Sequence, residues 1–274
     1  MASDFNTTTL GRTGLKVGRL GLAGSYGAPA GAYEAAFDRG CNYFYSGSGR
    51  KRSEMKAAVR TLVNRGYRDK MVISIQTYAR MGLMTEFLFK QALKSMGIGH
   101  TDILMLGWHN SKPSNRLIDF ALSMKEKGLA RFIGLSGHNR RLFADLAQSR
   151  ETDSIFDLFQ IRYNPAHTGA EKDCFPALDQ SYRQGIVSYT ATRWGHLLKD
   201  KYMPPGEPPL TASDCYRFAL SNPIVDICLT GPRNRAEVAH ALTVLDKGPL
   251  TPEETDRIRR IGAHVHDTAG GFFS

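Results

Sequence analysis

The chain alternates short apolar runs with longer stretches of helical periodicity along almost its whole length. Gly, Asn, Asp or Pro bounds each apolar run, as expected of parallel strands that are buried on both faces. We expect strands at residues 20–23, 42–45, 71–76, 102–106, 131–135, 156–161, 186–189 and 225–229. We expect helices between and after them at residues 31–39, 54–65, 85–96, 115–127, 140–148, 171–183, 211–220 and 235–245.

This alternation in 274 residues predicts an α/β fold, a (β/α)8 TIM barrel that forms one domain over residues 1–274. A doubly wound sheet also alternates, but no GxGxxG turn follows the first predicted strand. Residues 10–17 are typical of an N-terminal β-hairpin that would cover the bottom of the barrel. Thr251 and Pro252, followed by two acids, predict the start of an extra C-terminal helix. The proline-rich segment 203–209 is expected to be an ordered loop.

The net charge of +10 and the pI near 9.5 favour anionic partners. The basic residues are scattered and no nucleic-acid module stands out, so we expect no nucleic acid; a phosphorylated cofactor explains part of the excess. No apolar run approaches the roughly 20 residues that span a membrane, and no signal pattern opens the chain, so a cytoplasmic location is expected. The four cysteines form no CxxC pair, which indicates buried reduced thiols and no metal site.

The residues that follow each predicted strand are mostly polar or aromatic. In a barrel of this type the active site is built from the loops at the carboxyl ends of the strands. The rule nominates residues 24–26, 45–46, 77–78, 107–109, 136–138, 162–164, 189–190 and 230–233. The alternative is that some polar residues of these loops merely cap helices; Ser136 and Thr211 could each serve as an N-cap.

Six segments carry a resemblance to a known family. Residues 40–54, GCNYFYSGSGRKRSE, resemble the pattern G-x-N-x-F-D-T-A-x-x-Y-G-x-S-E. Residues 10–22 are close to the usual opening of the same family. Four later segments resemble its motifs G-x-S-N, V-Q-x-x-Y-N-P, G-I-x-x-Y-S and G-x-R-x-x-x-Q-L, in order, at residues 133–136, 159–165, 185–190 and 231–238. The chain is thereby identified as a divergent member of the aldo-keto reductase superfamily.

The resemblance implies a cofactor site for NADPH. Tyr189 would stack on the nicotinamide, with Gln160 and Ser136 at its carboxamide. The loop from Thr190 to Arg193 would contact the pyrophosphate. The adenosine phosphate would be bound at the next loop and helix start, by Gly231, Arg233, Asn234 and Arg235. The two arginines there favour NADP over NAD. Two departures weaken the match: Gly137 replaces the family's Asn, and residues 240–241 replace its Glu-Asn. The alternative for Arg233 and Arg235 is that they are solvent-exposed residues at the start of a helix and bind no phosphate.

The catalytic tetrad implied by the resemblance is substituted at every position. The family's Asp falls on Tyr45, its Tyr on Arg50, its Lys on Tyr78 and its His on Gly107. A new histidine, His109, appears two residues after the lost one. Reduction of a carbonyl needs a hydride and a proton acid together. Tyr45 or Tyr78 would therefore be the acid.

Two further roles complete this expected site. Arg50 would lower a phenol's pKa or clamp an anionic substrate. His109 would hydrogen-bond the substrate beside Trp108. Each residue also has a structural alternative. Tyr45 and Tyr78 could be packing residues at the barrel rim, and His109, which precedes Asn110, could cap a turn.

These observations leave three hypotheses open. The first is an NADP-dependent oxidoreductase with a rebuilt active site that transfers a hydride to a small carbonyl-like or other unsaturated substrate. The alternative is a catalytically silent NADP-binding sensor or partner protein, which would need no proton donor. A barrel lyase or isomerase that has dropped nicotinamide use is disfavoured by Gln160, Tyr189 and Arg233. Neither the substrate nor the oligomeric state follows from the sequence.

Overall fold

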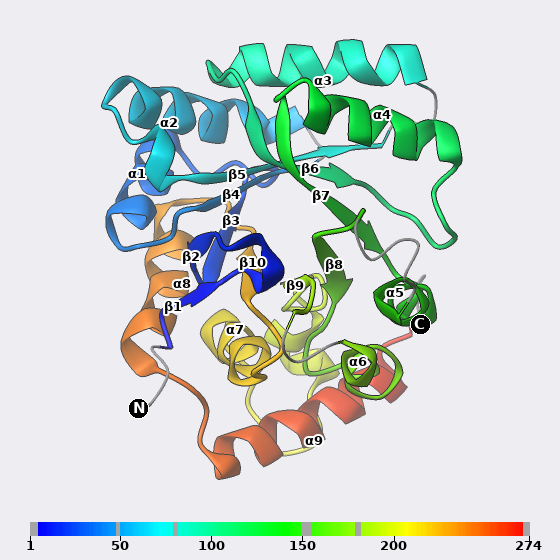
Figure 1. Ribbon diagram of the computed structural model, residues 1–274. Coiled ribbons are helices and arrows are strands. Elements are labelled where there is room, and N and C mark those ends of the chain that lie inside the picture. Colours follow the sequence, from blue (N-terminus) through cyan, green and yellow to red (C-terminus); the bar gives the residue numbers. More distant parts are fainter. Residues whose placement is uncertain (1–4, 48–49, 79–81, 149–154, 179–181, 271–274) are drawn as a thin grey trace.

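The strands of the chain close into a single parallel barrel. The computed structural model describes residues 5–47, 50–78, 82–148, 155–178 and 182–270. Within these residues the barrel runs in the order β10-β3-β4-β5-β6-β7-β8-β9 (Figure 1). The strands are β3 Leu20–Ala23, β4 Tyr43–Ser46, β5 Val72–Thr77, β6 Thr101–Leu106, β7 Ala130–Gly137, β8 Leu158–Arg162, β9 Gly185–Tyr189 and β10 Ile227–Thr230. The predicted TIM barrel is confirmed, with each strand within two residues of its expected bounds.

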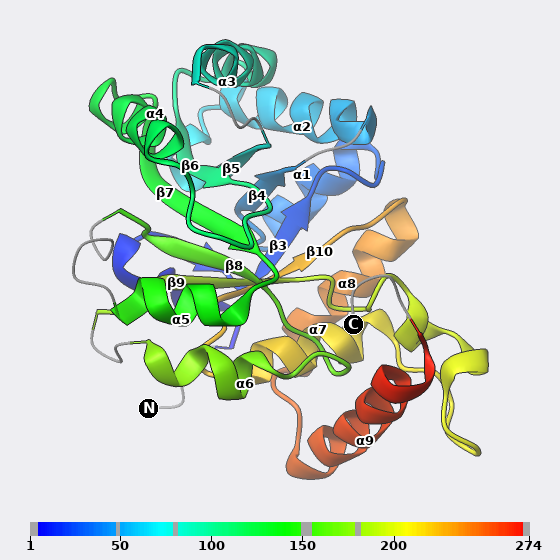
Figure 2. The same ribbon diagram turned by 90° about the vertical axis from the view of Figure 1, so that its right-hand side faces the viewer.

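Helices surround the barrel, and their apolar faces cover its outer surface (Figures 1 and 2). They are α1 Ala30–Asp38, α2 Ser53–Asn64, α3 Gly82–Met96, α4 Asn115–Glu126, α5 Arg140–Gln148, α6 Ala170–Asp173, α7 Ala212–Ser221, α8 Arg235–Lys247 and α9 Pro252–Thr268. A second, smaller apolar cluster lies apart from this layer and includes Tyr43, Tyr45, Val72, Ile103 and Leu158. Among the described residues, none of these helices is both long and apolar enough to cross a membrane.

Of the helix expected at residues 171–183, only residues 171–173 are α-helical, and residues 179–181 lie outside the described residues. Helix α6 ends at Asp173, and a short 3-10 turn, η4 Phe175–Ala177, follows it. Pro176 explains the break, because proline has no N–H to donate and its ring collides with the carbonyl one turn earlier. Apolar side chains around the break, among them Cys174 and Phe175, are nevertheless buried, which explains why the segment shows helical periodicity.

An N-terminal hairpin covers the bottom of the barrel, as expected, although its first strand precedes the nominated segment 10–17 and only its second strand overlaps it. Strands β1 Thr7–Thr9 and β2 Lys16–Gly18 pair antiparallel, and residues 10–15 connect them. The 3-10 turn η1 Gly11–Thr13 packs on the start of β9, where the Arg12 N–H donates to the Arg183 carbonyl at 2.8 Å. Leu10 is fully buried there.

Aspartates near the starts of alternate strands fix the register at the bottom. Asp102, Asp157 and Asp226 each accept a hydrogen bond, at 2.8–2.9 Å, from a backbone N–H of a neighbouring strand. Arginines neutralise them; Arg183, for example, donates to both oxygens of Asp226. Buried carboxylates that are paired and hydrogen-bonded in this way tie adjacent strands together.

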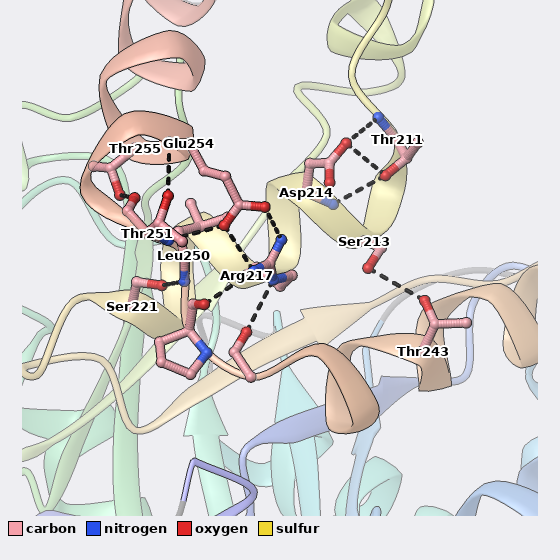
Figure 3. Close-up of polar contacts among 12 residues, drawn as sticks. Thr211, Ser213, Asp214, Arg217, Ser221, Thr243, Leu250, Thr251, Glu254 and Thr255 are labelled. Carbon is pink, nitrogen blue, oxygen red and sulfur yellow. Dashed lines mark hydrogen bonds and ion pairs between the residues drawn. The ribbon is translucent and has the colours of Figure 1, made fainter. Parts of the chain in front are cut away.

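The C-terminal helix α9 is tied to α7 by one arginine. Arg217 donates from Nη1 and Nη2 to the Glu254 carboxylate, both at 2.8 Å, and also reaches the carbonyls of residues 248 and 249 (Figure 3). Thr251 and Glu254 form a capping box at the start of α9, as Thr211 and Asp214 do at the start of α7. The predicted cap at Thr211 and the predicted start of α9 are confirmed.

Candidate active site at the carboxyl ends of the strands

A buried polar network occupies the upper end of the barrel interior. The Tyr45 hydroxyl, at the end of β4, donates to Oε1 of Gln76 at the end of β5. The Gln160 side chain, from β8, also hydrogen-bonds this hydroxyl, and the Tyr78 hydroxyl lies in hydrogen-bonding contact with it. Burial raises the pKa of Tyr45 well above its usual value, and the neighbouring Tyr78 raises it further. Tyr45 is therefore a poor acid in this setting, and its hydroxyl is already engaged.

Gly107 leaves the space that this network needs. A side chain at Gly107 would collide with the amide of Gln76, because its Cβ would overlap Nε2. The sequence places the family's histidine at this position. A side chain at position 107 would therefore compete for space with the Tyr45–Gln76 pair; Gln76 is 8% exposed. Sequence reasoning missed Gln76; its only signal was a glutamine near the end of a largely apolar strand.

The other two substituted positions of the expected site are Tyr78 and Arg50. Tyr78 follows β5, and its side chain is 38% exposed, so it can reach a ligand at the rim. Tyr26, 46% exposed, is close enough that Tyr78 adds to the burial that raises the Tyr26 pKa. Arg50 opens the 3-10 helix η2 Arg50–Arg52, but its side chain lies outside the described residues. Tyr45 and Tyr78 are therefore brought together, while the role of Arg50 stays a prediction.

The loop after β6 is held in an uncommon backbone shape. Trp108 has φ +60°, a left-handed conformation that a bulky residue seldom adopts, and its ring is exposed. Its N–H donates to Oγ of Ser136 at 3.1 Å, and the next N–H, of His109, donates to the Ser136 carbonyl at 2.7 Å. His109 itself is only 7% exposed. Trp108 therefore faces the rim, whereas His109 is turned into the protein.

The sequence also allowed Ser136 to be the N-cap of a helix instead of a ligand-binding residue. It lies inside β7 and accepts from Trp108, so it is not an N-cap. Asn139 holds the start of α5 instead, since its Oδ1 accepts from the Leu142 N–H at 3.3 Å.

Three expected cofactor residues end up at the carboxyl ends of adjacent strands. Ser136 of β7 pairs in register with Gln160 of β8, and Arg162 of β8 pairs with Tyr189 of β9. Oε1 of Gln160 is buried and has no hydrogen-bond partner among the described residues. The Tyr189 hydroxyl donates to the Gly137 carbonyl at 3.2 Å and contacts the His138 ring, which holds the tyrosine ring in place. A buried amide oxygen without a donor fits a ligand that brings one.

The loop after β9 has a second cluster of left-handed residues. Thr190, Arg193 and Trp194 have φ values of +55°, +48° and +51°. Strained backbone of this kind is concentrated at functional sites. Arg193, however, is only 4% exposed, and its guanidinium donates to the carbonyls of Val265 and Ala269 at the end of α9. The structure thus gives the arginine expected at the pyrophosphate a different partner.

The start of α8 presents the expected phosphate-binding groups to solvent. Asn234 caps the helix by accepting from the Glu237 N–H at 2.9 Å. Arg233 and Arg235 are both exposed, and Arg233 pairs with Glu237 at 2.7 Å. The Tyr26 ring packs against Gly231, where any side chain would collide with it. A helix N-terminus with two arginines can hold a phosphate, although Glu237 competes for one of them.

A comparison with protein-family models matches residues 29–214 of this chain, well over half of it, to the aldo/keto reductase family. The chain belongs to the aldo-keto reductase family. An aldo-keto reductase from Klebsiella pneumoniae in complex with NADPH superimposes with a TM-score of 0.77 at 18% identity, covering 94% of this chain and 95% of that chain. Aldo-keto reductase AKR11C1 from Bacillus halodurans, in its holo form, gives a TM-score of 0.74 at 17% identity, covering 93% and 95%. A search of curated sequences found no match.

This aldo-keto reductase also has a cavity of about 1140 Å³ beside the rim, between the start of α5, the loop after β8 and the last turns of α9. The sequence nominated Arg162 and His138, both of which line it, as strand-end residues. His167 and the contributions of α9 were missed, because nothing in the order of elements places the final helix beside the β8 loop. Among the described residues, no group of three or more His, Cys, Asp or Glu side chains is arranged to hold a metal ion.

Proposed function

We propose that this chain is an NADP-dependent oxidoreductase whose proton donor has moved within the rim of the barrel. The observation that carries the proposal is the unpartnered Oε1 of Gln160, which lies at the carboxyl end of β8 beside Ser136. The carboxamide of a nicotinamide has N–H groups that would satisfy this oxygen. The Ser136 hydroxyl accepts from Trp108 and retains its own proton to donate.

The neighbouring groups fit the rest of such a cofactor. Tyr189 would support the nicotinamide ring, and Thr190 would follow it along the chain. The N-terminus of α8, with Arg233 and Arg235, would take the phosphates and favour NADP over NAD. Similar solved aldo-keto reductases contain NADPH or NADP, which supports the same choice. Arg193 would serve the site indirectly, by fixing α9.

Tyr78 would donate the proton. When bound, the cofactor supplies a hydride to the carbon of a carbonyl-like or other unsaturated group in a small-molecule substrate. Tyr78 would protonate the atom that gains negative charge, since Tyr78 is 38% exposed while Tyr45 is buried and its hydroxyl is engaged. Tyr45 would position Tyr78 through the contact between their hydroxyls. The exposed Trp108 would form an apolar wall for the substrate.

A titration and a turnover assay test the proposal. NADPH should bind, as followed by its fluorescence, and should bind more tightly than NADH. NADPH oxidation should then be observed with at least one class in a panel of aldehydes, quinones, imines and enones. Absence of NADPH binding would refute the cofactor assignment.

One observation favours a second candidate, a catalytically silent NADP-binding protein. The Tyr45–Gln76 pair fills the place where the family's catalytic groups would stand. Tight NADPH binding with no turnover on any member of the panel would favour this candidate over the oxidoreductase.

We further propose that residues 1–274 act as one domain in the cytoplasm, and that the protein binds neither nucleic acid nor a membrane.

A further inference from the structure

The turn that follows β8 is closed around a buried asparagine. Asn164 is 0% exposed and lies just beyond the end of the strand. The His167 N–H donates to the Asn164 carbonyl at 2.9 Å, and the Asn164 N–H donates back to the His167 carbonyl at 3.4 Å. These two bonds make residues 164–167 a short closed turn. The side chain of Asn164 therefore starts from a fixed backbone position.

The amide group of Asn164 has a defined orientation in this turn. Its Oδ1 accepts from the Ala166 N–H at 3.0 Å and lies 3.2 Å from Nδ1 of His167. Because an amide oxygen cannot donate, Nδ1 of His167 carries the ring proton and donates it to this oxygen. With the oxygen held inside the turn, Nδ2 is left for the loop after β9, where it donates to the Thr190 carbonyl at 2.9 Å.

Thr190 has a backbone shape that depends on such contacts. Its φ of +55° lies in the left-handed region, which a β-branched residue seldom adopts and which persists where the surrounding structure enforces it. Its carbonyl accepts from the Arg193 N–H, inside the loop, at 2.8 Å and from Nδ2 of Asn164, outside the loop. Its Oγ1 donates to the Tyr189 carbonyl at 2.7 Å. The Asn164 bond thus holds the peptide group at which the chain leaves β9.

We propose that Asn164 is a positioning residue for the cofactor and acts through the Thr190 carbonyl. The inference rests on the proposed function, in which Tyr189 supports the nicotinamide and the loop that starts at Thr190 contacts the pyrophosphate. Without the Asn164 bond, Thr190 would spend part of its time at a negative φ. NADPH would then bind only the fraction of molecules that keep the loop in its present shape, so its apparent affinity would fall.

Asn164→Asp removes the donor and keeps the contacts inside the turn. The variant retains an oxygen for Ala166 and His167, but it sets a second carboxylate oxygen against the Thr190 carbonyl. At pH 9, where the carboxylate is ionised, fluorescence titration should give a dissociation constant for NADPH about tenfold above that of the wild type. The ratio should fall towards pH 6, since a protonated carboxyl group can donate to the Thr190 carbonyl as the amide does. In the wild type a pKa of about 3 keeps His167 neutral over this range.

Asn42→Asp is the matched control, at the bottom of the barrel. Oδ1 of Asn42 accepts from the Gly18 N–H at 2.9 Å, and its Nδ2 donates to the carbonyls of Lys16 and Lys70, both at 3.1 Å. The same substitution therefore removes the same kind of donor far from the loop after β9. It should lower the melting temperature and leave the affinity for NADPH close to that of the wild type at both pH values. The control separates a general loss of stability from a loss of loop position.

Hydrogen exchange in the cofactor-free protein follows the loop directly. The amides of residues 190–195 should exchange faster in Asn164→Asp than in the wild type, but not in Asn42→Asp. If Asn164→Asp fails to fold, Asn164→Ala, which buries no charge, replaces it in both measurements. Equal affinity for NADPH in the wild type and a folded Asn164 variant, or equal weakening in both Asp variants, would overturn the inference and leave the proposed function standing. A wild type that binds no NADPH would overturn both.

Discussion

Gly107 and Gln76 form a coupled pair at the residue scale, and a mutant cycle tests the coupling. Gly107→Ala should destabilise the protein by about 1–3 kcal/mol, because the new methyl group overpacks against the Gln76 amide. The same change in a Gln76→Ala background should cost less, since the obstructing amide is gone. Urea denaturation measures both costs. Equal costs in the two backgrounds would show that the residues do not interact.

The two tyrosines should differ in what they contribute. Tyr78→Phe should lower kcat by about 10²-fold or more while leaving the affinity for NADPH unchanged, because it removes only the proposed acid. Tyr45→Phe should instead cost about 1–3 kcal/mol of folding stability, since the buried Gln76 and Gln160 amides lose a hydroxyl partner. Steady-state kinetics and denaturation separate the effects. A larger kcat loss in Tyr45→Phe would reverse the assignment.

His167 makes folding stability depend on acid pH. Its pKa is about 3 in the folded protein, compared with 6.5 for an ordinary histidine. Between these values the unfolded chain binds a proton that the folded chain does not, so stability falls as the pH is lowered from about 6.5 towards 3. In His167→Phe the fall should be shallower, by up to about 1.4 kcal/mol per pH unit. Thermal denaturation from pH 7 to 4 measures the slope; identical slopes would contradict the shift.

The link between the β9 loop and α9 belongs to the element scale. Arg193 donates to two carbonyls at the end of α9, and both the arginine and its partners are buried. Arg193→Met should therefore expose the last turn of α9 and increase its amide hydrogen exchange at least tenfold, since charge-assisted bonds contribute about 1.5–3 kcal/mol each.

A matched variant controls for general loss of charge on α9. Arg257→Met breaks only a partly exposed pair with Glu207, which is 2.9 Å long, so exchange in the last turn should hardly change. Faster exchange in both variants alike would mean that Arg193 has no special role in holding the helix.

Elements that depend on local signals could be predicted from the sequence. Buried parallel strands are short and apolar, and turn-forming residues bound them. The predicted bounds of β3 therefore agree with the structure at both ends, and those of the other strands agree within two residues. The capping signals at Thr211 and Thr251 act within one turn and were also sufficient. The helix over residues 171–183 failed because Pro176 overrides an apolar periodicity that loop packing also produces.

The candidate site was harder to predict, because its side chains meet only after the barrel closes. The strand-end rule nominated Tyr45 and Tyr78, and the family resemblance nominated Gln160. The strand-end rule did not reveal that Gln76 fills the space above Gly107, since that contact depends on the register between β5 and β6. Nor did it show that Arg193 points to α9, a contact across 72 positions of sequence.

At the scale of the whole molecule, the two ends of the barrel differ in what their buried polar groups do. The bottom end pairs its carboxylates with arginines and backbone N–H groups, which secures the register of the strands. The upper end keeps Oε1 of Gln160 and Nε2 of His167 without partners among the described residues. Unsatisfied buried atoms lower stability, so those at the rim favour ligand binding there, although Nε of Arg68 at the bottom also has no partner among the described residues.

The central claim is that the cofactor half of the site remains while the catalytic half has been rebuilt. The most direct test is the dissociation constant of NADPH in the wild type, Gln160→Leu and Gln76→Leu, measured by fluorescence titration. The two variants each remove a buried glutamine from one network, but only Gln160 is assigned to the cofactor. We predict about tenfold weaker binding in Gln160→Leu and little change in Gln76→Leu. Equal weakening in both, or no NADPH binding by the wild type, would contradict the claim.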